Sequence, residues 1–198
     1  MIHYTAMRSA EGARDWLCAE KSGVSAHYVI AEDGRCWQLV AEEARAWHAG
    51  AGAWGEVTDV NSRSIGIELA NSGGQPFAAP QMAVLEDLLA GIMARWGIPP
   101  AGVIGHSDSA LGRKVDPGPR FDWRRLARCG LSIWPDRRDP GDFHAAARRF
   151  GYRWQAGQEE ALLAAVRMRF RPWASGPLED TDRALMADLA ARWPGPGA

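Results

Sequence analysis

The stretch GHSDSALGRKVDPGPRFDW, Gly105–Trp123, gathers one histidine, three aspartates, two serines and a lysine between several turn-forming residues. It follows the short apolar run AGVI (101–104), which we expect to form a strand that ends at the histidine. Three interpretations compete: a charged surface loop, the nucleophile elbow of a serine hydrolase, or half of a metal site. The elbow is disfavoured, because Ser109 replaces the last glycine of GxSxG and Gly112 and Pro117 interrupt the helix that should follow.

The metal interpretation needs ligands from two parts of the chain. His106 and Asp116 can supply two ligands from this loop, and catalytic zinc commonly takes three protein ligands and one water. Asp116 precedes Pro117, which favours an extended backbone there. In an extended chain Lys114 and Asp116 point to the same side, so an ammonium group would lie beside the metal.

The third ligand has to come from the remaining histidines: His3, His27, His48 and His144. His144 falls in a helical region and His27 in the middle of a strand, where a core or supporting role is expected. His48 lies in the loop AWHAG and can contact a substrate. His3 is favoured because its apolar strand stops soon afterwards, a frequent place for functional residues. The alternative is that His3, His106 and Asp116 are merely polar residues at strand ends.

Glu68 is a separate candidate in the segment SRSIGIELAN (62–71). The period of two places Ile65, Ile67 and Leu69 on one face of the predicted strand and Glu68 on the other, together with Gly66. Gly66 removes bulk beside Glu68 and leaves room for a ligand or a close backbone. A buried glutamate is unfavourable unless it is paired or functional. Glu68 is therefore either a functional carboxylate or part of a solvent-facing strand surface.

The rest of the chain predicts an α/β fold with a mixed central β-sheet flanked by helices, plus a small C-terminal three-helix domain. Strands are expected within 2–6, 25–40 (a hairpin turning at Asp33-Gly34) and 62–71, and helices over 10–20 and 80–96. After a charged, Pro/Gly-bearing linker, helices are expected over 143–152, 158–170 and 179–193. We therefore predict two domains, residues 1–135 and 136–198.

Composition excludes several classes of function. A net charge of −1 over 198 residues offers no electrostatic footprint for nucleic acid. No run approaches the ~18 apolar residues of a membrane span. Three cysteines without CxxC spacing indicate reduced, structural thiols. The first residues do not resemble a signal peptide, so we expect a cytoplasmic location, or a periplasmic or envelope location if a targeting segment precedes them. We also expect a monomer.

Five motifs occur in order along residues 1–135: IHYTA, VSAHYVIAEDG, AWHAG, SIGIELAN and GHSDSALGRKVDPGPRFDW. Together they strongly resemble the zinc-dependent N-acetylmuramoyl-L-alanine amidases, a bacterial family related to phage lysozyme-type amidases and animal peptidoglycan recognition proteins. The helical segment containing AAVRMRFRP resembles, more weakly, the peptidoglycan-binding module that follows some of these amidases.

The resemblance implies a role for each candidate residue. His3, His106 and Asp116 match the zinc (Zn²⁺) ligands of the family. Glu68 matches the general base or water-positioning glutamate, and Lys114 matches the lysine that stabilises the oxyanion. The implied reaction is cleavage of the amide between N-acetylmuramic acid, or its 1,6-anhydro form, and L-alanine of peptidoglycan or a muropeptide. The alternative is a non-catalytic peptidoglycan-recognition protein of the same fold, which would be expected to lack a zinc ligand.

Overall fold

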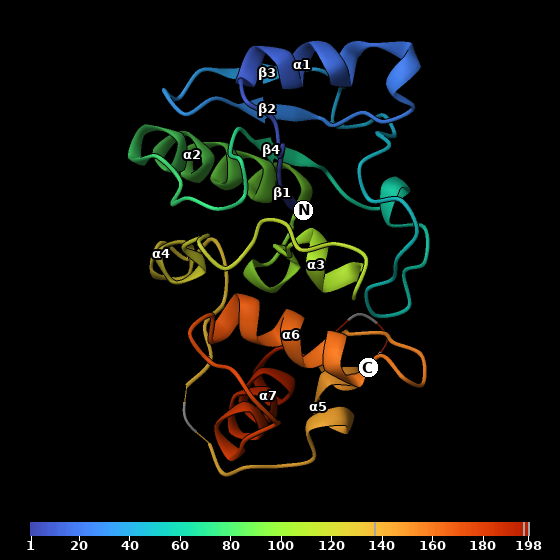
Figure 1. Cartoon of the computed structure of the whole chain (residues 1–198), viewed down its shortest axis with the longest axis vertical. Coiled ribbons are helices and arrows are strands. Elements are labelled where there is room, and N and C mark those ends of the chain that lie inside the picture. The colour runs from blue at the N-terminus through green and yellow to red at the C-terminus, as the bar shows by residue number, and fades with distance from the viewer. Residues whose placement is uncertain (137, 196, 198) are drawn as a thin grey trace.

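The computed structural model describes residues 1–136, 138–195 and 197 (Figure 1). A four-stranded sheet has the order β1-β4-β2-β3. Strand β4 runs parallel to both β1 and β2, whereas β3 is antiparallel to β2, so the predicted mixed sheet is confirmed. The strands are β1 (Ile2–Tyr4), β2 (Tyr28–Ile30), β3 (Cys36–Gln38) and β4 (Ile67–Leu69). The hairpin turns at Asp33-Gly34 as expected, and Gly34 adopts a φ of 91° that suits glycine.

Helices cover both faces of this sheet. The long helix α2 (Ala79–Trp96) buries Leu85 and Leu89 in one core with Ile30 and Leu69, and it ends at Gly97 in the left-handed conformation. Helix α1 (Ala10–Cys18) begins with a Ser9 cap and packs Ala10 against Ala31 and Ala70. Ala31 and Ala70 directly follow Ile30 and Leu69, so they point to the opposite face, and α1 and α2 therefore enclose the sheet.

The strand that we expected over 101–106 is not formed. Only a bridge joins Gly105 to Ile2, and the Ile2 amide donates to the Ile104 carbonyl at 2.9 Å. The Gly105 amide instead donates to Asp108 Oδ2 at 2.8 Å. The Asp108 carboxylate thus holds the start of the short helix α3 (His106–Ser109), into which the chain turns directly after the bridge. His106 therefore stands at the start of a helix rather than at the mouth of a strand.

Several short helical elements were not predicted. Helix α4 (Trp123–Arg128) is capped by Asp122, whose side chain accepts from the Arg125 amide. Single 3₁₀ turns are η1 (Glu20–Ser22), η2 (Val60–Ser62) and η3 (Pro100–Gly102). Such turns are too short to leave a periodic apolar pattern in the sequence.

The three predicted C-terminal helices are confirmed as α5 (Phe143–Phe150), α6 (Glu159–Phe170) and α7 (Asp180–Arg192). They lie together below α3 and α4, at the opposite end of the molecule from β2 and β3 (Figure 1). Their buried side chains share one hydrophobic cluster with Met1, Trp54, Val60, Ile104 and Leu111. The helical unit is therefore docked on the preceding residues through common apolar packing, while the division at 135/136 stays a prediction.

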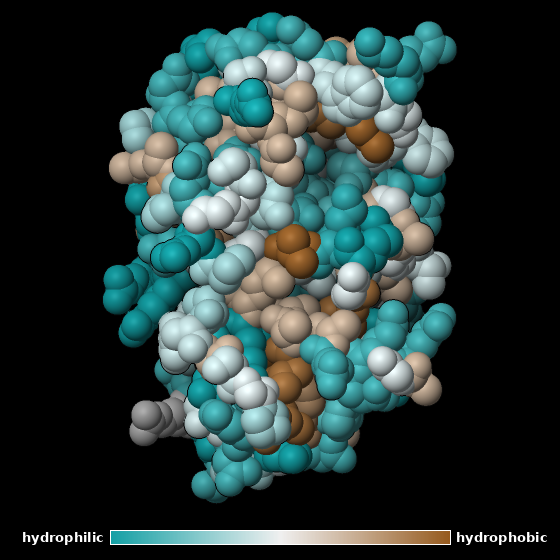
Figure 2. All heavy atoms as spheres, viewed as in Figure 1, coloured by the Kyte–Doolittle hydropathy of each residue, from teal (hydrophilic) through white to brown (hydrophobic). Residues whose placement is uncertain are grey.

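Within the described ranges, no helix combines the length and the apolar composition that crossing a bilayer requires. On the face shown in Figure 2, hydrophilic residues surround limited apolar areas near the centre. Most large apolar side chains are instead packed in the two main clusters of the interior.

Candidate metal centre

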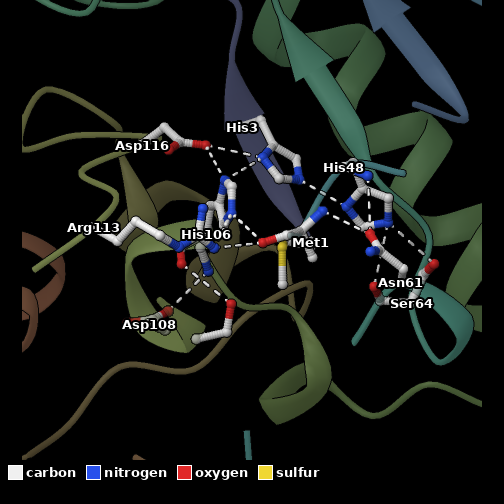
Figure 3. Close-up of polar contacts among 12 residues, drawn as sticks. Met1, His3, His48, Asn61, Ser64, His106, Asp108, Arg113 and Asp116 are labelled. Atoms are coloured by element: carbon white, nitrogen blue, oxygen red, sulfur yellow. Dashed lines mark hydrogen bonds and ion pairs between the residues drawn. The ribbon is translucent and has the colours of Figure 1, made fainter. Parts of the chain in front are cut away.

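His3, His106 and Asp116 meet in one buried cluster, as the metal hypothesis expected (Figure 3). His3 Nδ1 lies 3.0 Å from His106 Nδ1 and 2.9 Å from Asp116 Oδ2, and His106 Nδ1 lies 3.1 Å from the same oxygen. None of the three residues is more than 7% exposed. The fold thus brings His3 against two residues more than one hundred positions later in the chain and closes a triangle of three ligand-type atoms.

Three different elements hold these side chains. His3 is the middle residue of β1, and its register partner on β4 is Glu68. His106 is the first residue of α3. Asp116 lies in the following loop, and its carbonyl accepts from the Ser107 amide at 2.9 Å, which joins the loop to the start of α3.

The tautomer of His106 follows from its second ring nitrogen. His106 Nε2 lies 2.9 Å from the Ala49 carbonyl oxygen, which can only accept a hydrogen bond. The proton of a neutral His106 is therefore on Nε2. Nδ1 consequently presents a lone pair to His3 and Asp116.

The tautomer of His3 follows from a longer chain of contacts. Ser64 Oγ donates to the Val60 carbonyl, so both Ser64 oxygens, each 3.4 Å from His48 Nε2, are acceptors toward that ring. His48 Nε2 therefore carries the proton and His48 Nδ1 accepts. His3 Nε2, 3.0 Å from His48 Nδ1, must then donate. His3 Nδ1 is left with a lone pair facing Asp116.

Three lone pairs thus converge on one small volume, which is the electronic arrangement that a cation satisfies. Burial lowers the pKa of His3 to about 4. Burial acts to raise the pKa of Asp116, but the adjacent His106 and His3 imidazoles outweigh it and hold that pKa well below its usual range. Ligands placed tetrahedrally around zinc at about 2.0–2.1 Å are separated by about 3.3 Å, close to the observed 2.9–3.1 Å. Two imidazoles and one carboxylate therefore fit a divalent metal, and zinc in particular.

The loop that contains AWHAG supports His3 and His106, a role that was not predicted from the sequence. Asn61 Oδ1 accepts from the His48 amide at 2.9 Å and from the Ala49 amide at 2.8 Å. Asn61 therefore holds both groups that accept from the two histidines: the His48 ring, which accepts from His3, and the Ala49 carbonyl, which accepts from His106. Arg113 adds a second restraint, because its Nη2 donates to the Ala49 carbonyl at 2.6 Å and to the Ala51 carbonyl. These partners resemble the outer hydrogen bonds that orient metal-binding histidines in general.

Gly66 makes room for this arrangement. A Cβ atom at Gly66 would overlap the ring of His48. The sequence indicated that Gly66 leaves space beside Glu68, and the structure places the His48 ring there. His48, for which substrate contact was considered, therefore supports His3. His27, expected in a core or supporting role, accepts from the Gly66 amide through Nδ1 at 3.0 Å.

Glu68 and Lys114 differ in their surroundings. Glu68 is half-buried, but its Oε2 is inaccessible to solvent and has no hydrogen-bond partner in the described part of the chain. The pKa of Glu68 is raised to about 8, mainly by burial and also by the charge of Asp116, while Lys114 opposes this shift. Lys114 is exposed. The charges of the cluster, of Glu68 and of Lys114 therefore act on one another.

The remaining candidates do not join the cluster. A helix does follow His106, contrary to the expectation used against the elbow, but Ser107 and Ser109 are both buried. Ser109 Oγ donates to the His106 carbonyl, so neither serine offers an accessible nucleophile. His144 lies in α5 next to Trp154.

Known proteins resemble this chain over most of its length. Residues 1–119 match the N-acetylmuramoyl-L-alanine amidase family. The chain is 34% identical over 224 aligned positions to N-acetylmuramoyl-L-alanine amidase AmiD of Escherichia coli (strain K12), covering 95% of this chain and 80% of that protein. It is 42% identical over 103 residues to 1,6-anhydro-N-acetylmuramyl-L-alanine amidase AmpD of Haemophilus influenzae, covering 52% of this chain and 56% of that protein.

Solved structures extend the likeness to the whole fold. AmiD from E. coli, in complex with the substrate anhydro-N-acetylmuramic acid-L-Ala-D-γ-Glu-L-Lys, superposes with a TM-score of 0.88 at 33% identity and covers 97% of this chain and 88% of its own. AmpDh3 from Pseudomonas aeruginosa, in complex with anhydromuramic pentapeptide, gives a TM-score of 0.89 at 31% identity, covering 98% and 91%. With its ordered motifs, its fold and its His-His-Asp cluster, this chain belongs to the N-acetylmuramoyl-L-alanine amidase family of hydrolases.

Proposed function

We propose that this enzyme hydrolyses the amide bond between the lactyl group of N-acetylmuramic acid, or its 1,6-anhydro form, and the L-alanine of a stem peptide. The observation that carries the proposal is the convergence of three lone pairs from His3, His106 and Asp116. The substrate class comes from the relatives, because AmiD and AmpDh3 are known in complex with anhydromuramyl peptides. Cell-wall turnover or recycling is the process in which such a bond is cleaved.

His3 Nδ1, His106 Nδ1 and Asp116 Oδ2 would hold one zinc ion. When bound there, zinc supplies Lewis acidity that activates water and polarises the amide carbonyl. Glu68 is the general base: its buried Oε2 has no competing partner within the described ranges, and the positive charge of a metal held by the cluster would favour the ionised carboxylate. The carboxylate can then take a proton from water and pass it to the leaving amine. The exposed ammonium group of Lys114 opposes the negative charge that develops on the carbonyl oxygen. The products are a muramyl sugar and a peptide that begins with L-alanine.

Replacement of Glu68 by alanine tests this assignment. The variant should retain stoichiometric zinc, because Glu68 is not among the three ligands, but lose the proton transfer that contributes roughly 10²–10⁴-fold to such reactions. Mass spectrometry of products from an anhydro-muropeptide and from intact peptidoglycan measures the turnover and the substrate preference together. If wild-type protein with stoichiometric zinc binds these substrates but releases no peptide, the recognition-protein alternative is correct.

For the C-terminal unit, residues 136–198, we propose contact with the glycan polymer. Trp173 follows α6 and is 75% exposed, the largest exposed fraction among the bulky apolar residues. Nearby, Phe143, Leu163, Met168 and Pro177 line a groove of about 800 Å³. An exposed indole beside a groove provides a surface on which a sugar ring can stack. Trp173→Ala should therefore reduce co-sedimentation with purified sacculi while turnover of a soluble anhydro-muropeptide is retained.

The compartment and the oligomeric state remain predictions from the sequence. Fractionation of cells that express the natural gene tests the cytoplasmic expectation against a periplasmic or envelope location. Light scattering during size-exclusion chromatography tests the expected monomer.

A further inference from the structure

A buried carboxylate two residues after His106 connects the candidate metal centre to the C-terminal helices. Asp108 is 1% exposed and lies in α3. Its Oδ2 accepts from the Gly105 amide at 2.8 Å and from Arg169 Nη1 at 2.6 Å, and its Oδ1 accepts from the Tyr152 hydroxyl at 2.7 Å. Asp108 lies close to His106 in the same turn (Figure 3).

Arg169 comes from α6 but makes its described contacts with residues before position 135, apart from its neighbour Phe170. Its Nη2 donates to the Val103 carbonyl at 2.9 Å, and its guanidinium lies 4.3 Å from the centre of the Trp123 ring. The side chain is almost completely buried. A buried guanidinium is favourable only with a well-placed anion and several acceptors, so Arg169 and Asp108 restrain one another strongly.

Helix α3 depends on such outside restraints. It has only four residues, and a single turn of helix does not hold itself together. The His106 ring is fixed at Nε2 by the Ala49 carbonyl, whereas the backbone of the turn is fixed at its start by Asp108. The position of His106 Nδ1 therefore depends on where Asp108 is held.

We propose that Arg169 and Tyr152, through Asp108, are positioning residues that set the metal-binding geometry of His106. The C-terminal helices then complete the hydrolytic site, in addition to any contact with the polymer. This inference rests on the metal site proposed above. It assigns the α5–α6 region a role in catalysis that a separate polymer-binding module would not have.

Metal affinity of the full-length protein provides the test. Metal-free wild type, Arg169→Met and Tyr152→Phe are titrated with zinc against a chromophoric chelator at a temperature where circular dichroism shows each protein folded. Loss of an outer hydrogen bond of a metal ligand typically weakens binding about 10–100-fold. We expect that range for Arg169→Met and a smaller loss, about 3–10-fold, for Tyr152→Phe, which removes one hydroxyl and leaves the ring packing intact.

Arg167→Met is the matched control. Arg167 is also on α6, is also buried, and pairs with the buried Asp182 at 2.6 Å, but these contacts stay within the C-terminal unit. The Arg167→Met substitution removes a comparable buried ion pair without touching α3, so the zinc affinity of this variant should stay within about 2-fold of wild type. Arg169→Lys, which keeps the charge but not the two-pronged geometry, should recover part of the loss.

The outcomes separate the two proposals. If folded Arg169→Met and Tyr152→Phe bind zinc as tightly as wild type, or if Arg167→Met is weakened equally, the positioning role is wrong. If wild type itself binds no zinc, the proposed metal site of His3, His106 and Asp116 is wrong, and the positioning role falls with it. With zinc saturating, Tyr152→Phe should lower kcat for a soluble muropeptide and leave KM within about 2-fold; a change in KM alone would also overturn the positioning role.

Discussion

Replacing Glu68 by glutamine should remove a pH-dependent loss of stability from the metal-free enzyme. The pKa of Glu68 is raised from 4.5 to about 8, first by burial. Between these two values the unfolded chain has released the proton while the folded protein still holds it. Folding then takes up a proton, so the free energy of unfolding falls as the pH rises through this window. Below about pH 4.5 both states hold the proton and the loss disappears.

The size of the effect follows from the two pKa values. With 4.5 in the unfolded state and about 8 in the folded state, linkage gives a loss of about 1 kcal/mol at pH 5 and about 3 kcal/mol at pH 7. These are upper limits, because Glu68 is only half-buried even though its Oε2 is inaccessible. Glutamine has the same shape and no charge. The free energy of unfolding of the variant, relative to that of wild type, should therefore rise by about 2 kcal/mol between pH 5 and pH 7.

Urea unfolding of both proteins at pH 5, 6 and 7, in the presence of a chelator, measures how the stability difference between variant and wild type changes with pH. Titration of His3 and Asp116 contributes to each curve but largely cancels between the variant and wild type at each pH. A difference between the proteins that is the same at pH 5 and pH 7 would refute the reasoning, because it would mean that Glu68 is ionised in the folded state across this range.

Three further outcomes are expected. Gly66→Ala should place a methyl group against the His48 ring, lowering stability by about 1–3 kcal/mol and zinc affinity about 10-fold; equal affinity by chelator competition would contradict this. Asn61→Ala should leave the amides of His48 and Ala49 without an acceptor, which costs about 2–4 kcal/mol in urea unfolding; a loss below about 0.5 kcal/mol would mean that water replaces the side chain. Chelation should lower the melting temperature reversibly, since metal at 1,000 times its Kd stabilises the folded state by about 4 kcal/mol; an unchanged melting temperature would argue against a metal held by the fold.

Periodic elements could be predicted from the sequence, but elements made by single hydrogen bonds could not. Helix α2 and the three C-terminal helices carry repeating apolar positions, which local spacing reveals. The range 101–106, expected to be a strand, instead begins in η3 and ends in α3, where the Asp108 side chain captures the Gly105 amide. No periodic signal marks such a capture.

Prediction of the site residues from the sequence meets the same limit. His106 and Asp116 were recognisable because they share one loop with the chemistry of metal ligands, and His3 because its strand ends beside it. Asn61 and Arg169 act through contacts with residues 12 or more positions away, and nothing in their local sequence distinguishes them from surface residues. Gly66 gave a partial signal, since a glycine within a strand indicates a close approach, but not which group approaches.

Anomalous diffraction at the zinc absorption edge, from crystals of active enzyme, tests the central claim most directly. We predict one anomalous peak within bonding distance of His3 Nδ1, His106 Nδ1 and Asp116 Oδ2, with about one zinc per chain. Fully active crystals with no peak among these three atoms, or with the peak elsewhere, would contradict it.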